Sequence, residues 1–396
     1  MYFKLLLPFL AISMTALSSA AAESLTPAEV RIRQAESALS DGAPAYQEYN
    51  RLAMAHARRA REIADTSHYG KALAALAQSF KLEPGNYEGR KIEAWVLLGQ
   101  HEFAQAFEKA SELNRLAPDD VMIYGLVADA AIELGRYGEA EKAAQWMLDL
   151  RPGNVPGLTR GAYLRELFGD VDGAIDFMSQ AYNRIPPAET EDRAWTLTHI
   201  AHLQMSNSNL AAAEKTLEQA FALFPDYHYA LAQLGKLRMK QERPGDAVNA
   251  FRRRYEVAPH PENLYDVARA LEKDGREAEA AEAFRRFEKL ARAEMKVADN
   301  CNRELTFYYL DQGANPAEGL RIIREEMKRR QDVFTRHAHA WALFRNGEYH
   351  AANDEITAAL AIGIRDEEML AHAASIGERL QKRREIASNQ GVTRTR

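Results

Sequence analysis

The sequence predicts an all-α solenoid of about nine helix pairs with capping helices at both ends. Six of the 14 prolines keep one phase, with steps of 34 residues and a single step of 39. These prolines are Pro84, Pro118, Pro152, Pro186, Pro225 and Pro259. An alanine stands twelve residues before each of them, and these are Ala72, Ala106, Ala140, Ala174, Ala213 and Ala247. Because proline cannot continue a helix and a small residue lets two helices approach closely, each period predicts two packed helices and a proline-marked turn.

Glycine marks a second, shorter turn inside several periods. Gly135, Gly169 and Gly347 stand where a glycine would end the first helix of a pair. This combination resembles the tetratricopeptide repeat (TPR), a helix–turn–helix unit of 34 residues. The resemblance implies a right-handed superhelix, with the array over residues 53–365. Its units begin near Ala53, Tyr87, Val121, Val155, Ala194 and His228, and degenerate units follow near Pro261, Asn300 and Val333.

The N-terminus is typical of a bacterial export signal. A basic residue, Lys4, precedes the apolar run Leu5 to Leu17, and the small residues Ser18 to Ala22 follow it. We therefore expect a cleaved signal peptide over residues 1–22, with a retained anchor as the alternative. Residues 50–84 and 340–373 also resemble exported bacterial TPR proteins. That resemblance implies bacterial export. Because no later segment of the sequence is apolar enough to span a bilayer, we expect a periplasmic protein with no stable membrane insertion after cleavage.

The segments that flank the array are expected to form capping helices. Thr26 and Pro27 suit the N-cap and first position of a helix, so residues 23–52 are expected to form N-terminal capping helices. Residues 366–388 are expected to form a C-terminal capping helix, and residues 389–396 a disordered tail. Inside the array, the five extra residues Ala188 to Asp192 predict an acidic polar loop.

Composition excludes several classes of function. The chain has 396 residues and a formal charge of −6, which argues against a nucleic-acid partner bound through counterion release. Its single cysteine, Cys301, cannot form an intrachain disulfide and is expected to be a buried thiol. No phosphate loop, nucleophile elbow or zinc-protease motif is present, so we expect no enzyme activity and no cofactor. His199 and His202 share a helix face, but the sequence offers no third ligand, so no metal site is predicted.

The TPR resemblance implies a concave groove lined by the first helix of each unit. Residues at the matching unit positions are mostly aromatic or charged, and aromatic rings bury large areas at low entropy cost. The groove candidates are Trp95, Asp129, Tyr163, Trp195, His202, Tyr229, Lys236, Tyr265, Arg269, Tyr308 and Trp341. The alternative for each ring is packing between neighbouring units.

These features predict a non-catalytic scaffold or adaptor of the bacterial cell envelope. Its partner would be a protein or peptide segment held in the groove. The alternative is a glycan, as in TPR proteins associated with polysaccharide export, because the groove aromatics also suit sugar rings.

Overall fold

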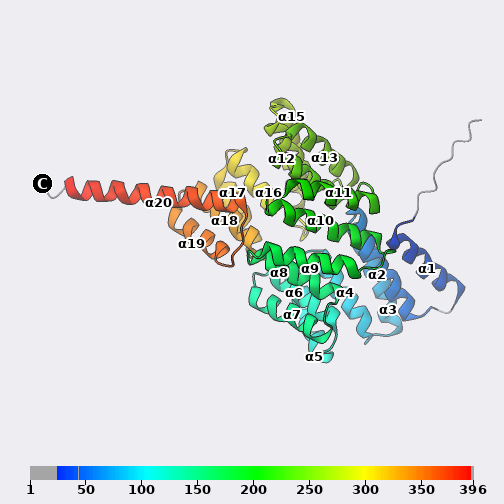
Figure 1. Ribbon diagram of the computed structural model, residues 1–396. Helices are drawn as coiled ribbons and strands as arrows, with labels where there is room; N and C mark the ends of the chain where they lie inside the picture. The colour runs from blue at the N-terminus through cyan, green and yellow to red at the C-terminus, as the bar shows by residue number, and fades with distance from the viewer. Residues whose placement is uncertain (1–24, 43, 394–396) are drawn as a thin grey trace, which may run out of the picture.

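The protein is a solenoid of paired helices (Figure 1). The computed structural model describes residues 25–42 and 44–393, and within them the chain forms 20 helices and no strand. α1 (Pro27–Asp41) and α20 (Glu367–Thr393) lie at the ends, and the helices between them form nine pairs, which confirms the predicted all-α solenoid. The pairs are α2 (Tyr46–Ile63) with α3 (Ser67–Leu82), α4 (Tyr87–Gly99) with α5 (Phe103–Leu116), α6 (Val121–Glu133) with α7 (Tyr137–Leu150), α8 (Val155–Leu167) with α9 (Val171–Arg184), α10 (Thr190–Ser206) with α11 (Leu210–Leu223), α12 (His228–Lys240) with α13 (Pro244–Val257), α14 (Pro261–Lys273) with α15 (Glu277–Glu294), α16 (Asn302–Asp311) with α17 (Pro316–Glu326), and α18 (Val333–Arg345) with α19 (Tyr349–Leu360).

The phased residues have the structural roles that their spacing predicts. Each second helix from α3 to α13 ends two residues before its proline, as α3 does at Leu82 before Pro84. All six phased alanines lie on these second helices, and each is 0% exposed. A larger side chain at these positions would separate the two helices of a pair, so the alanines set the close packing.

The two ends of the chain depart from the predicted boundaries. Thr26 caps α1 by accepting a hydrogen bond from the Glu29 backbone N–H. The first pair starts at Tyr46, inside the predicted cap 23–52, so α1 alone precedes it in the described residues. α20 continues to Thr393, into the predicted tail 389–396. The predicted export signal, residues 1–22, lies outside the described residues. Among the described helices, none combines the length and apolar character needed to cross a bilayer.

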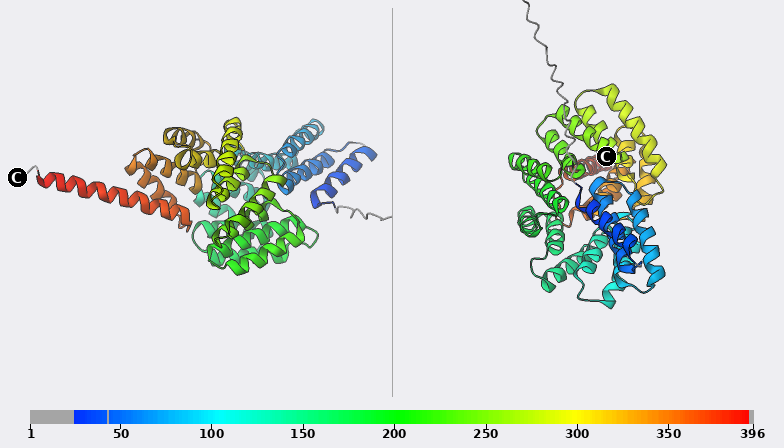
Figure 2. Two further views of the ribbon diagram at one scale, coloured as in Figure 1. Left: turned by 90° about the horizontal axis from the view of Figure 1, so that it is seen from above. Right: turned by 90° about the vertical axis from the view of Figure 1, so that its right-hand side faces the viewer.

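The N-terminal pair docks against the middle of the array. Seen end on, the helix pairs encircle a centre, and the N-terminal helices lie across it (Figure 2). Arg61 at the end of α2 forms ion pairs with Glu191 and Asp192 at the start of α10. Farther along, His228 lies 2.9 Å from the Arg61 carbonyl oxygen through its Nε2. The superhelix is therefore closed by contacts between units that are far apart in sequence.

These contacts correct the prediction of a loop over residues 188–192. α10 begins at Thr190, so Glu191 and Asp192 lie in its first turn, and Glu191 is only 4% exposed. The carboxylates are ordered because the guanidinium of Arg61 pairs with both of them, while Arg58 lies 3.5 Å from Asp192.

A second closure joins the turns of the third and fourth pairs to the C-terminal units. Gly135 and Gly169 have left-handed φ angles of +71° and +81°. A Cβ on Gly135 would lie 2.6 Å from the Gln331 carbonyl oxygen, and one on Gly169 would lie 2.4 Å from that of Gly363. The Gln331 N–H donates to the Glu133 carbonyl oxygen at 2.9 Å. Glycine is thus needed here both for the turn and for the close approach.

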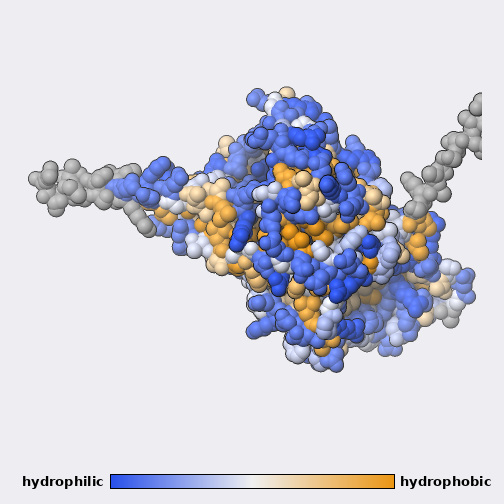
Figure 3. All heavy atoms as spheres, in the orientation of Figure 1, coloured by the Kyte–Doolittle hydropathy of each residue, from blue (hydrophilic) through white to orange (hydrophobic). Residues whose placement is uncertain are grey.

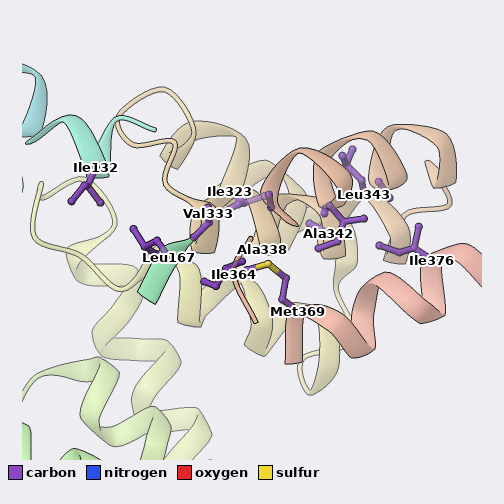
Figure 4. Close-up of a cluster of buried hydrophobic side chains, with 14 of the residues drawn as sticks. Ile132, Leu167, Ile323, Val333, Ala338, Ala342, Leu343, Ile364, Met369 and Ile376 are labelled. Atoms are coloured by element: carbon purple, nitrogen blue, oxygen red, sulfur yellow. The ribbon is translucent and has the colours of Figure 1, made fainter. Parts of the chain in front are cut away.

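Apolar side chains seal this second closure. Leu167 and Ile132, from α8 and α6, belong to the same buried cluster as Val333, Ile364 and other residues of the C-terminal units (Figure 4). The core is therefore continuous across the junction, and the closure is hydrophobic as well as polar.

Candidate functional site: a central cavity

The closed superhelix encloses a cavity of about 1470 Å³. Its wall is formed mainly by the first helices of the pairs, from α2 to α16, and by residues of the loop before α18. Hydrophobic side chains gather near the middle of the face shown in Figure 3, within a largely polar surface. The cavity is the concave side of the solenoid, which the two closures narrow into a hollow that stays partly open to solvent.

Five of the predicted groove residues line this cavity. They are Trp95, Asp129, Tyr163, Trp195 and Tyr229, on α4, α6, α8, α10 and α12. Each stands on the first helix of a different pair, as the TPR resemblance implies. The structure therefore brings together candidates that span five consecutive units.

The cavity aromatics are held by neighbouring polar groups. The His199 ring lies between Tyr163 and Trp195, with centroid distances of 6.2 Å and 5.7 Å. Tyr229 is 36% exposed, and this surface faces the cavity, where burial raises the pKa of its hydroxyl. Burial also raises the pKa of Tyr163 well above its usual value. Both phenols are therefore neutral hydrogen-bonding groups over the physiological pH range.

Most charges along the array side of the cavity are paired within the protein. Arg160 donates to the Asp129 carboxylate at 2.5 Å, and its Nε donates to the Gly125 carbonyl oxygen at 3.2 Å. Lys91 pairs with Asp120 at 2.8 Å. This part of the wall offers rings, hydroxyls and neutralised ion pairs to a guest.

His202 does not line the cavity but joins a cluster behind its wall. The Nε2 atoms of His199 and His202 lie 2.8 Å and 2.7 Å from the two oxygens of Glu166. Burial alone would raise the pKa of Glu166, but the hydrogen bonds from the two imidazoles outweigh it and hold the pKa well below its usual value. Among the described residues, no group of three histidine, cysteine or acidic side chains is arranged to hold a metal ion.

Two further candidates are exposed outside the cavity. Lys236 is a solvent-exposed residue of α12. Arg269, on α14, is also exposed and lies 3.3 Å from Glu368 of α20. Neither contributes to the cavity wall.

Three aromatic candidates are packed rather than free to meet a guest. Tyr265 and Tyr308 are 6% and 9% exposed and lie in the core, because the long helix α15 brings Phe287 within ring-contact distance of both. Trp341 stacks on His372 of α20, with centroids 3.7 Å apart and planes 3° apart. These three rings pack against neighbouring elements, which is the alternative to a groove position.

The opposite wall of the cavity contains residues that the repeat positions did not indicate. They come from the end of α2 and the starts of α3, α14 and α16, with the last residue of α15, and they include Arg61, Tyr69, Glu262, Glu294, Arg303 and Glu304. Cys301 is here too, 4% exposed, and burial raises the pKa of its thiol, in line with the expected buried thiol. The unit pattern could not reveal this wall, because the superhelical closure alone brings it opposite the groove. The one local signal of that closure was the acidic insertion Ala188 to Asp192, which runs into the first turn of α10.

Comparisons with known proteins agree on the fold. A family model described as tetratricopeptide repeat matches residues 93–155 and 233–294. None of the curated proteins matches the sequence at a significant level. A chain of the solved APC/C hetero-tetramer Cut9–Hcn1 is 15% identical with a TM-score of 0.53, and the match covers 87% of this chain and 59% of that one, less than two thirds of its length. A monomeric mutant of IFIT1 with Gppp-AAAA is 12% identical with a TM-score of 0.52, over 86% of this chain and 96% of that one. At these identities the similarity shows the fold alone, and it confirms a superhelix of the tetratricopeptide type.

Proposed function

We propose that this tetratricopeptide-repeat solenoid is a non-catalytic scaffold of the bacterial cell envelope that holds a segment of a partner protein in its central cavity. The repeat fold is that of a protein-interaction scaffold, since stacked pairs create one extended concave surface. The envelope setting rests on the export signal expected in residues 1–22.

The observation that supports this function is the gathering of five groove candidates in one cavity. Its volume of about 1470 Å³ exceeds the roughly 300–1,000 Å³ of pockets for small molecules, which favours a larger guest such as a peptide segment. The wall contains both aromatic rings and paired charges. It can therefore bury the apolar side chains of a peptide and also accept hydrogen bonds from the peptide backbone.

Site-specific crosslinking tests the proposal directly. A photo-crosslinking phenylalanine analogue at Trp195, inside the cavity, is expected to capture a protein in living cells. The matched control is the same analogue at Trp146 of α7, which is 53% exposed and does not line the cavity. Capture of a protein at position 195 but not at 146 supports the proposal, whereas no adduct at 195, or equal adducts at both, contradicts it.

The envelope setting has its own test. Cell fractionation and N-terminal sequencing of the mature protein are expected to give a periplasmic chain that begins after Ala20 or Ala22. A cytoplasmic chain that retains Met1 would contradict this part of the proposal and leave peptide binding in place.

A glycan is the second candidate guest, favoured by the groove candidates Trp95, Tyr163, Trp195 and Tyr229, whose rings line the cavity. Fluorescence of the two cavity tryptophans would be quenched by a bound glycan. A panel of envelope glycans that produces no quenching removes this candidate.

A further inference from the structure

Three carboxylates form an acidic wall on the far side of the cavity. Glu262 lies in the first turn of α14, Glu294 is the last residue of α15, and Glu304 lies in the first turn of α16. All three line the cavity. We call this set, with the adjoining Asn263, the acidic wall.

The acidic wall differs from the rest of the cavity because its charges are poorly compensated. Among the described residues, neither Glu294 nor Glu304 forms an ion pair, and Glu262 has only Arg254 at 3.4 Å. The neighbouring basic side chains are directed elsewhere: Arg303 lies 3.4 Å from Asp332, and the His260 Nε2 lies against the Ala64 carbonyl oxygen.

The amide of Asn263 provides an independent sign of a missing partner. Asn263 is 1% exposed and lines the same cavity beside Glu262. Its Nδ2 donates to the Ala258 carbonyl oxygen at 2.7 Å, while its Oδ1 has no hydrogen-bond partner among the described residues. Buried acceptors are nearly always satisfied, so this oxygen is left for a donor that the described residues do not supply, from water or from a guest.

Electrostatics of the wall agree with a cationic guest. Burial raises the pKa of Glu304, and Glu262 adds to the rise, which outweighs the opposing effect of Arg303. Burial likewise raises the pKa of Glu294, where Asp299 and Glu262 add to the rise and His260 opposes it. A bound cation would relieve this repulsion and compensate the desolvation of the carboxylates.

We infer that the acidic wall binds the guanidinium or ammonium group of a basic side chain on the guest segment. This inference rests on the proposed function and specifies its partner as a segment that carries Arg or Lys. A guanidinium has five donors and can bind several carboxylate and amide oxygens at once. The aromatic side of the cavity then holds the apolar neighbours of that basic residue.

The test uses fluorescein-labelled decapeptide pools on the full chain, read by anisotropy. The pools are identical except at one central position, which is Arg in one and its neutral isostere citrulline in the other. Because a charged hydrogen bond is lost, the Arg pool is expected to bind about ten-fold tighter than the citrulline pool. The double variant Glu294→Gln/Glu304→Gln is expected to lose this preference.

Controls separate the possible failures. Glu325→Gln changes an exposed carboxylate of α17 outside the cavity and should keep the Arg preference. Thermal melting shows whether the double variant is folded, and the single variant Glu304→Gln serves if it is not. Equal binding of both pools, or a preference that survives in the folded Gln variants, overturns the inference. If both pools bind equally and Trp195→Ala abolishes binding, the cavity function stands without the acidic wall. If neither pool binds, the proposed peptide function and the inference fall together.

Discussion

The guanidinium of Arg61, near the end of α2, forms an ion pair with the carboxylate of Glu191, in the first turn of α10. The Tyr227 hydroxyl also donates to Glu191, and the Tyr227 and Glu191 side chains are nearly inaccessible to solvent. The pair thus joins the first unit to the fifth and sixth, at the point where the superhelix closes.

Removing the cation of this pair should open the closure. Arg61→Met leaves the Glu191 carboxylate, 5% exposed, without its main partner. We expect the free energy of unfolding to fall by about 2–4 kcal/mol and the radius of gyration to rise. Urea unfolding and small-angle scattering measure the two effects. Arg51→Met is the control, because the Arg51 side chain is 70% exposed in its pair with Glu48 on the same helix. Its expected cost is below about 1 kcal/mol, and equal costs for the two variants would contradict the closure.

Gly135→Ala should cost more than an alanine at a comparable turn. Both Gly135 and Gly347 have left-handed φ angles, +71° and +83°. A Cβ at Gly135 would meet the Gln331 carbonyl oxygen at 2.6 Å, whereas one at Gly347 meets nothing within 4 Å. We expect Gly347→Ala to cost about 1–2 kcal/mol from backbone strain alone and Gly135→Ala to cost about 1–3 kcal/mol more. Denaturant unfolding measures the loss of unfolding free energy in each variant. Equal losses would mean that the Gly135–Gln331 contact does not contribute to stability.

Trp195 and Trp341 should respond in opposite ways to truncation. Trp195 lines the cavity, so Trp195→Ala is expected to weaken guest binding about ten-fold or more with a smaller effect on melting. Trp341 stacks beneath α20, so Trp341→Ala is expected to lower stability by about 2–4 kcal/mol. Binding and thermal melting are measured on both variants. A sharp fall in melting temperature for Trp195→Ala would assign that ring to the core.

The His337–His372 contact should make the C-terminal cap sensitive to acid. Burial lowers the pKa of His337 to about 4, and His372, whose Nδ1 lies 2.8 Å from its Nε2, adds to the shift. The pKa of His337 in the folded protein is thus below its unfolded value of about 6.5. The contribution of the neutral His337 to the free energy of unfolding is therefore complete above pH 6.5 and is lost as the pH falls toward 4. The loss at pH 4 is at most about 3 kcal/mol.

Substitution isolates this histidine from the other carboxylates and imidazoles. His337→Asn is expected to flatten the decline of stability between pH 6.5 and 4, as followed by urea midpoints. His350→Asn alters an exposed histidine of α19 and should leave the decline unchanged. An unaltered decline in His337→Asn would exclude this pair as its source.

The register of the array could be predicted because its signals are local. The predicted unit starts at Val121, Val155 and His228 coincide with the first residues of α6, α8 and α12. Proline and alanine act on the helix that contains or precedes them, so their phase alone fixes these boundaries.

The state of each groove ring was harder to predict because it depends on contacts between units. Tyr265 occupies a groove position of its unit, but Phe287 of the long α15 packs against it at 5.0 Å. Trp341 is covered by His372, a residue of the capping helix rather than of the repeat. The position of a residue within its unit predicts whether its side chain faces the groove of a regular, open array. These two rings are instead covered by α15 and α20, elements that depart from the regular repeat.

The docking of α2 on α10 also limits how this chain can change its length. An open array can gain or lose a unit at little cost, because each unit contacts only its neighbours. Here an added pair between α3 and α10 would rotate Arg61 away from Glu191, and one between α7 and α17 would move the Gly135 turn out of reach of Gln331. Because the turn before α20 also meets Gly169, duplication or deletion of single units is expected to be selected against throughout the span from α2 to α20.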